Sequence, residues 1–412
     1  MRLIAILASA ALLVPAAAST MGCSSSDSGS SGSPTDDTGV SDDTSTGGGD
    51  TGTGGGDTGA GGGDTGTGGG DTGTGKDTGT SPGDTGTGAD TGIGTDTGTP
   101  IVDSGPPGPV AMIGPCQIYP ADNPWNRDVS KDAVSADNAK YLGTMHTSTS
   151  LHPDWGSVAD QYGIPYTIGT GAAPVKMTWT ASWGISDSDK LKCADGSDFC
   201  YPIPSTALIE GGAAASTTSD RHLLYLDTAG APTNCTLYEL YNAQNWTGPG
   251  WTAQNGAIFH LGSNALRPDG LTSSDAAGLP VLPGLVRYDE VKAGEIKHAI
   301  RFTMNNTYQG YIHPATHAAG LSSSSFPPMG LRMRLKASVD LSGYSGEVKV
   351  ILTAMKKYGI ILADNGSNWY ISGDTNDGWS STVMDNIVSG FGKIHGGDFE
   401  VVDSGPVSTA GL

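Results

Sequence analysis

Residues 255–317 read NGAIFHLGSNALRPDGLTSSDAAGLPVLPGLVRYDEVKAGEIKHAIRFTMNNTYQGYIHPATH, and strand-like pieces alternate with turn-like pieces along them. Half of the chain's 8 histidines fall in this stretch, namely His260, His298, His313 and His317. In one predicted strand, Ile300, Phe302 and Met304 share a face and Arg301 lies on the other. His298 shares the apolar face, so it is either a hydrogen-bonded core histidine or the floor of a pocket. Polar side chains this dense among apolar strands are typical of a site.

The same alternation of strand and turn continues through the region 109–412. The predicted strands cover residues 164–168, 175–183, 222–227, 235–241, 296–304, 331–340, 360–363, 369–372 and 399–402. The predicted helices cover residues 135–144, 348–358 and 381–389. We expect strands 360–363 and 369–372 to pair as a hairpin across the turn Asp364-Asn365-Gly366-Ser367. The pattern predicts one mainly β domain, a β-sandwich or jelly-roll with two or three short helices.

The strand predicted at residues 331–340 has an unusual polar face. Arg332, Arg334 and Lys336 alternate with apolar residues along it, so three cations lie side by side. One interpretation is a solvated face whose cations pair with carboxylates on the next strand. The other is a platform for an anionic ligand, such as a uronate or a sulfated sugar.

The N-terminus predicts export. Residues 1–22 combine Arg2 with a short apolar run, as secretory signal peptides do. Met21-Gly22-Cys23 resembles the lipobox of bacterial lipoproteins, which implies lipidation of Cys23 and a place at the outer membrane or cell surface. The alternative is ordinary signal cleavage, which would leave Cys23 in the linker. Residues 23–108 repeat glycine, aspartate and threonine and predict a disordered tether.

The acidic charge belongs largely to this tether. It contains fourteen Asp and one Lys, which account for about −13 of the formal charge of −21. The remaining region is mildly acidic, and binding to nucleic acid is disfavoured because phosphate contacts need a basic field. We expect no cofactor, because the sequence has no P-loop, no dinucleotide glycine fingerprint and no HExxH motif.

The cysteine count fits an exported protein. If Cys23 is lipidated, four of the 5 cysteines remain, and an even number favours disulfides. Cys193 and Cys200 bracket a turn-rich loop that a bond between them would close, which leaves Cys116 with Cys235. Four cysteines allow three pairings, so the connectivity stays open.

Two kinds of polysaccharide-cleaving chemistry are compatible with the residues. A lyase needs a group that neutralises a carboxylate, a base and an acid. The lyase candidates are His222, His298, Arg301, Tyr311 and His313. A glycoside hydrolase needs two carboxyl groups instead. The hydrolase candidates are Glu210, Asp220, Asp269, Glu290 and Asp364, and nothing in the sequence singles out a pair. His313 and His317, four residues apart, are a weaker candidate for a zinc site without a visible third ligand.

Tryptophans in glycine-rich loops are suited to stacking on sugar rings, although core packing is the common alternative. We expect Trp246 and Trp251, in the segment NWTGPGWT, to be exposed. The candidate ligand-binding residues are Trp246, Trp251, Arg267, Asp269, Arg332 and Arg334.

Three segments carry a family resemblance. They are DAAGLPVLPGLVRYDEVKAGEIKHAIRFT within residues 274–303, PPMGLRMRLKASVDLSG, and KKYGIILADNGSNWYISG. The region resembles a family of uncharacterised exported bacterial proteins, which implies a folded domain and no particular activity. Our leading hypothesis is a lipid-anchored surface protein whose β-rich domain binds and processes polysaccharide. The alternative is a non-catalytic surface module that binds glycan or a protein partner.

Overall fold

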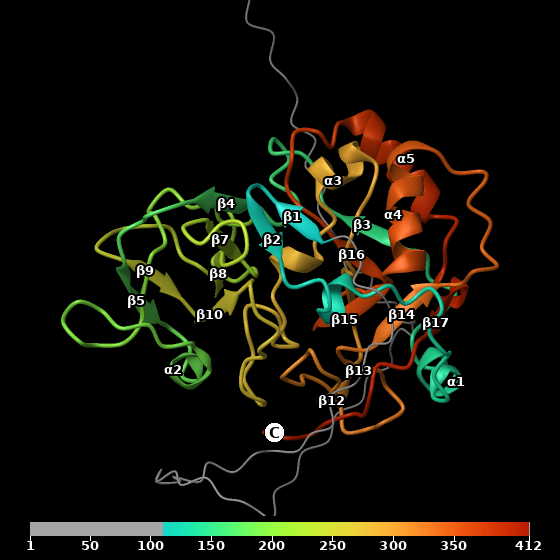
Figure 1. Cartoon of the computed structure of the whole chain (residues 1–412), viewed down its shortest axis with the longest axis horizontal. Helices are drawn as coiled ribbons and strands as arrows, with labels where there is room; N and C mark the ends of the chain where they lie inside the picture. Colours follow the sequence, from blue (N-terminus) through green and yellow to red (C-terminus); the bar gives the residue numbers. More distant parts are fainter. Residues whose placement is uncertain (1–109, 412) are drawn as a thin grey trace, which may run out of the picture. The chain divides into compact units, whose positions relative to one another are not determined.

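The computed structural model describes residues 110–411, which belong to one compact unit (Figure 1). The predicted signal peptide at 1–22, the tether at 23–108 and the lipidation site Cys23 lie outside the described residues. Strands predominate over helices and are arranged in several sheets, so the mainly β class is confirmed.

The largest sheet has six strands in the order β17-β14-β15-β11-β16-β3. Its strands are β3 (His152–Asp154), β11 (Ile300–Met304), β14 (Arg332–Leu335), β15 (Ile360–Asn365), β16 (Tyr370–Ser372) and β17 (Phe399–Val401). β11 lies between β15, to which it is parallel, and β16, to which it is antiparallel. The six-stranded sheet is therefore mixed, and its central strand comes from the stretch 255–317.

The other sheets are smaller. A four-stranded sheet has the order β10-β8-β7-β4, a three-stranded sheet has the order β6-β5-β9, and two pairs complete the set. Their strands are β1 (Ala111–Ile113), β2 (Cys116–Ile118), β4 (Tyr166–Gly169), β5 (Val175–Trp179), β6 (Cys200–Tyr201), β7 (Leu223–Asp227), β8 (Thr236–Tyr241), β9 (Trp251–Ala253), β10 (Asn255–His260), β12 (Tyr308–Tyr311) and β13 (Pro328–Met329).

The helices gather mainly beside the six-stranded sheet, where Figure 1 shows α3, α4 and α5 together. The helices are α1 (Asn138–Leu142), α2 (Gly184–Asp187), α3 (Tyr288–Ala293), α4 (Gly346–Lys357) and α5 (Ser381–Phe391), with short 3₁₀ turns at Pro124–Asn126, Leu282–Gly284 and Gly396–Asp398. The predicted helix 348–358 is confirmed as α4, which buries Ile351, Leu352 and Met355 with helical spacing.

Two cores follow from these sheets. The larger apolar cluster includes Phe302 and Met304 of β11, Leu362 of β15 and the buried face of α4. The smaller cluster lies between the four-stranded and three-stranded sheets and is rich in aromatic side chains, including Tyr225 and Trp251. The candidate site described below draws its residues from both parts of the fold.

The predicted hairpin between residues 360–363 and 369–372 is wrong. Both strands form, as β15 and β16, but β11 pairs with each of them and separates them. A local turn signal favours adjacent pairing. β11 has two edges whose backbone groups need hydrogen-bond partners. Pairing with β15 on one edge and β16 on the other buries the strand completely.

The strand predicted at 331–340, with one solvated or cleft-lining face, is shorter than expected and that face is not solvated, although Arg332 lines a cavity. β14 spans four residues, and Arg332 and Arg334 are buried together with their apolar neighbours. Arg334 donates to Glu400 on the adjacent β17 over 2.8 Å, so the carboxylate pairing considered for this face is confirmed there. Arg332 donates to the backbone carbonyls of Tyr358 and Arg127.

The described region contains two disulfides, and both expected pairs are confirmed. Cys193 bonds to Cys200 across a separation of 7 residues, and Cys116 bonds to Cys235 across 119 residues. The second bond ties β2 to the chain just before β8. It therefore joins the start of the described chain to the four-stranded sheet.

Candidate functional site

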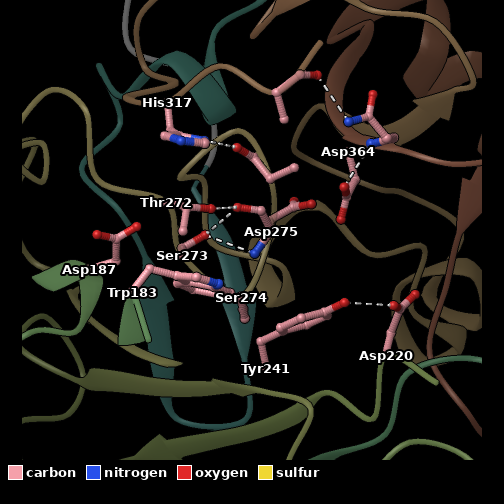
Figure 2. Close-up of a pocket in the computed structure, with 13 residues that line it drawn as sticks. Trp183, Asp187, Asp220, Tyr241, Thr272, Ser273, Ser274, Asp275, His317 and Asp364 are labelled. Carbon is pink, nitrogen blue, oxygen red and sulfur yellow. Dashed lines mark hydrogen bonds between the residues drawn. The ribbon is translucent and has the colours of Figure 1, made fainter. Parts of the chain in front are cut away.

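A cavity of about 490 Å³ lies where the ends of β8 and β15 meet the loop that follows β10 (Figure 2). Four carboxylate side chains, one tyrosine, one histidine and one tryptophan face it. The lining residues are Trp183, Asp187, Asp220, Tyr241, Thr272, Ser273, Ser274, Asp275, Ala276, His317, Ala319, Asp364 and Asn365. The concave shape and the convergence of titratable groups make this cavity the candidate functional site.

A buried carboxyl group holds the loop 272–276 in place through hydrogen bonds. Glu239, on β8 and fully buried, accepts a hydrogen bond from the Ser274 hydroxyl at 2.7 Å and from the backbone amides of Val281 and Leu282. Asn255, also fully buried, donates to the Ser273 carbonyl at 2.8 Å. These bonds join the ends of the loop to the four-stranded sheet and so hold Asp275 in place.

Asp275, Arg301 and Asp364 form the buried wall of the cavity. Arg301, on β11, binds both oxygens of Asp275, with Nη2–Oδ1 and Nε–Oδ2 distances of 2.7 and 3.2 Å. The same Nη2 lies 3.8 Å from Oδ2 of Asp364 on β15. Its Nη1 donates to the Ser372 hydroxyl. One guanidinium therefore serves two carboxyl groups, and bidentate pairing favours Asp275 as its main partner.

Asp364 is the carboxyl group most suited to keeping a proton. Burial and the neighbouring charge of Asp275 raise its pKa well above the ordinary value, and Arg301 only partly opposes them. The Asp364 side chain still has 24% of its surface exposed, whereas that of Asp275 has none. The raised pKa favours the protonated form of Asp364, which faces the cavity beside the Asp275–Arg301 ion pair. This arrangement can donate a proton to a bound ligand.

Asp220 and Tyr241 form a second polar pair at the cavity, joined by a 3.2 Å hydrogen bond from the Tyr241 hydroxyl (Figure 2). The next residues along the chain, Arg221 and Asn242, have φ angles of 48° and 51° in the left-handed region. The Asn242 amide donates to the Asp220 carbonyl at 2.7 Å. Such left-handed backbone conformations persist only where the surrounding structure holds them. The hydrogen bond between the two segments therefore helps to fix the orientation of the Asp220–Tyr241 pair.

The remaining polar and aromatic groups lie around the cavity. His317 bonds through Nδ1 to the Ala276 carbonyl at 2.7 Å, which orients its ring in the wall. Trp183 is 38% exposed and offers an aromatic face. Arg267 binds Asp189 at 2.8 Å and the Asp187 carbonyl at 2.9 Å, so this predicted ligand-binding residue anchors the α2 side of the cavity.

The predicted lyase residues do not converge. His298 is fully buried and bonds to the Ala299 carbonyl and, through Nε2, to Glu290 at 3.0 Å. Arg287 pairs with the same Glu290 oxygen at 2.7 Å. His298 is therefore the hydrogen-bonded core histidine of the two interpretations offered above, and Arg301 alone of these side chains reaches carboxylates of the cavity.

His313 and Tyr311 lie next to each other, with 5.8 Å between their ring centroids, and neither lines this cavity. His313 bonds to Asp269 at 2.8 Å and borders a separate cavity. Tyr311 is buried and donates to the Ala410 carbonyl. His313 lines this separate cavity and His317 lines the first, so the two histidines face different spaces. Among the described residues, no group of three or more His, Cys, Asp or Glu side chains is arranged to hold a metal ion.

His222 lies nearer the candidate site. It is 3% exposed, and its ring centroid lies 5.8 Å from that of Tyr241. Its backbone amide donates to Glu210 at 3.1 Å, while its Nδ1 atom has no hydrogen-bond partner within the described chain. His222 therefore packs against the Asp220–Tyr241 side of the cavity without lining it.

The prediction that Trp251 is an exposed stacking surface is wrong. Trp251 is 2% exposed, and its indole nitrogen donates to the Ile203 carbonyl. Trp246 is half-buried and packs edge-on against it, with 5.2 Å between ring centroids. The glycine-rich setting suggested a loop tip, but aromatic packing between the two smaller sheets outweighs it.

Sequence reasoning missed several lining residues. Asp275, Tyr241 and Trp183 were not candidates, although Asp275 follows two serines within residues 255–317. The sequence Ser-Ser-Asp is typical of an ordinary turn. The role of Asp275 depends on its contact with Arg301, which is distant in the sequence. Asp220 and Asp364 were hydrolase candidates, and both line the cavity.

No family model matches the chain, and neither a curated protein nor a solved structure is significantly similar to it. None of the helices between residues 110 and 411 has both the length and the apolar character needed to span a bilayer. The fold and the site together define a mainly β protein with a carboxyl-lined cavity.

Proposed function

We propose that the domain is a glycoside hydrolase whose active site is the cavity at Asp275 and Asp364. The observation that carries this proposal is the carboxyl pair served by a single arginine, because it leaves Asp364 protonated where a ligand can meet it. Hydrolysis of a glycosidic bond needs one carboxylic acid and one carboxylate on either side of the bond. Asp364 is assigned as the acid and Asp220 as the carboxylate.

The reaction assigned to these groups is balanced. Asp364 gives its proton to the leaving glycosidic oxygen as the bond to the anomeric carbon breaks. Water supplies the new bond to that carbon, and Asp220 takes the proton that the water releases. The Tyr241 hydroxyl, bonded to Asp220, orients that carboxylate. Trp183 offers a surface on which a sugar ring can stack.

The charges of the cavity support a neutral or positively charged sugar. Asp187, Asp220, Asp275 and Asp364 face it, whereas Arg301 is already engaged by two of these carboxyl groups. A uronic substrate would meet negative potential and no available arginine. Hydrolysis is therefore proposed in preference to a lyase reaction on an anionic polysaccharide.

The proposed location follows from the N-terminal sequence. Cys23 in its lipobox-like setting is proposed as a lipid anchor at the outer membrane or cell surface, with residues 23–108 as the tether. The two disulfides support an oxidising compartment. The proposed polymeric partner is polysaccharide, and the proposed membrane contact is the lipid alone.

One observation favours the alternative, a non-catalytic glycan-binding module. His298 and Tyr311, both predicted to be catalytic, have structural partners in the core and not in a cleft. In that case Trp183 and the carboxylates would recognise a sugar without acting on it. The two functions differ in whether Asp364 transfers a proton.

The test is the release of reducing ends from neutral, uronic and amine-bearing polysaccharides. We expect the natural chain to hydrolyse a neutral or amine-bearing polymer, and Asp364→Asn to lower kcat by roughly 10²–10⁴-fold. Asp269→Asn is the matched control, because this carboxylate lies at the surface near His313. Ultraviolet absorbance from an unsaturated product would instead indicate a lyase. Binding without any product would support the module.

A further inference from the structure

A second hollow, of about 230 Å³, adjoins the candidate site and shares Asp220 with it. Its lining includes Asp154, Tyr162, Glu210 and Ser219. Asp154 ends β3 of the six-stranded sheet, whereas Ser219 and Asp220 precede β7 of the four-stranded sheet. The second hollow therefore continues along the same junction of sheets as the first cavity.

The charges of the two hollows act on common groups. The Tyr241 hydroxyl has its pKa raised to about 12, first by burial and then by the charges of Asp220, Asp364 and Glu210. Arg301, in the wall of the first cavity, is in turn stabilised in its charged form by Asp275, Asp364 and Asp154. Asp220, which lines both hollows and accepts a hydrogen bond from Tyr241, therefore lies at their junction.

The second hollow has side chains suited to a sugar. Glu210 exchanges two bonds with His222, one from its own backbone amide at 2.9 Å and one from the His222 amide to its Oε2 at 3.1 Å. Burial raises the pKa of Glu210, which favours the protonated form as a donor to a hydroxyl group. Tyr162, 41% exposed, adds an aromatic surface.

We propose that the two hollows form one continuous cleft, in which the hollow beside Glu210 is a second sugar subsite. The substrate is then a chain of several sugar units and not a small glycoside, and Asp220 lies where the chain passes from one subsite to the next. This inference rests on the proposed hydrolytic function. Contacts made by remote units of a polymer contribute to catalysis when they help to orient the bond that breaks.

The experiment measures kcat/KM against chain length for cello-, xylo- and chitosan oligosaccharides of two to six units. With the natural chain, kcat/KM is expected to rise by roughly tenfold or more between the shortest and the longer oligomers. Ser219→Trp fills the second hollow and is expected to abolish this rise, so the ratio of kcat/KM between the longer and the shortest cleaved oligomers is the readout. Thr217→Trp, an exposed change in the same loop outside the lining, is the matched control and should retain the rise.

The outcomes separate the two proposals. A flat dependence on chain length, or a rise that persists in Ser219→Trp, overturns the second subsite while hydrolysis stands. If the natural chain cleaves none of the oligomers, the hydrolytic function fails. Calorimetric titration of the same oligomers then tests the continuous cleft independently of catalysis. An affinity that grows with oligomer length, and that stops growing only in Ser219→Trp, supports the cleft. An affinity independent of length overturns it.

Discussion

The chemistry of the site depends on which of two neighbouring carboxyl groups holds a proton. Asp275 has the bidentate arginine, and Asp364 has only the more distant contact of 3.8 Å. Two carboxylates and one guanidinium leave one negative charge in excess at the wall. A single protonation removes that excess, and the partly exposed Asp364 is the group that can exchange the proton with a ligand.

Asp275→Asn tests this division of roles. Removing the Asp275 charge takes away a cause that raises the pKa of Asp364, and it frees Arg301 to pair with Asp364 more closely. We expect the pKa of Asp364 to fall, measured by carbon-detected NMR titration of its carboxyl group. In an active hydrolase the loss of activity at high pH should move to lower pH as well.

Asp187→Asn is the control for this measurement, because Asp187 also lines the cavity but its side chain accepts from the Ser186 hydroxyl and, within the described residues, does not bond to the Asp275–Arg301–Asp364 group. An equal shift in both variants would mean that the general negative potential of the cavity sets the pKa, and the specific pairing would lose its support. Arg301 is less suitable for substitution, since breaking a buried ion pair costs about 3–5 kcal/mol of stability.

At the scale of elements, the loop 272–282 is positioned by one buried acid. Burial raises the pKa of Glu239 from an ordinary value of 4.5, even though three hydrogen bonds favour its charged form. Below pH 4.5 the group is protonated in the folded and unfolded states alike. Above it the unfolded chain releases the proton that the folded chain keeps, so the free energy of unfolding falls as the pH rises towards the folded pKa.

Glu239→Gln should remove this pH dependence. The amide cannot ionise, so the stability of the variant relative to the natural chain is expected to improve as the pH rises above 4.5. Denaturant unfolding at a series of pH values measures the difference. Glu347→Gln, in the first turn of α4, is the control for the removal of a carboxyl group as such. A constant difference between Glu239→Gln and the natural chain across the series would contradict the buried, protonated Glu239.

The elements themselves were largely predictable, because periodicity is a local property. Alternating apolar residues predicted β7, β8 and β11, and a helical period predicted α4. The pairing of strands was not predictable in the same way. β11 separates β15 from β16 because two strands from elsewhere in the sequence bury it better than a local hairpin would, and no turn motif records that choice.

The site was predictable in part for the same reason. Asp364 and Asp220 were candidates as residue types, and the structure brings both to one cavity. His298 was ambiguous because an apolar strand face describes a core histidine and a pocket histidine equally. The roles of Asp275 and Arg301 depend on the contact between them, which joins segments that are distant in the sequence. Period-two alternation likewise identified the cations of β14 but not the burial of both faces.

At the scale of the whole molecule, the two disulfides should contribute unequally to stability. A disulfide restricts the unfolded chain more when the loop that it closes is longer. The Cys116–Cys235 bond closes a separation of 119 residues, and the Cys193–Cys200 bond closes only 7. Cys116 and Cys235 are also fully buried, where they pack in the larger core beside Ile118.

Replacing Cys116 and Cys235 together by alanine is expected to lower the free energy of unfolding by roughly 5 kcal/mol, against roughly 2 kcal/mol for the pair Cys193 and Cys200. Equilibrium denaturation of the full chain measures both, and the second pair is the control for loss of a disulfide as such. The order of the two effects is the decisive result. If the short loop costs as much as the long one, native-state contacts of each disulfide outweigh chain entropy.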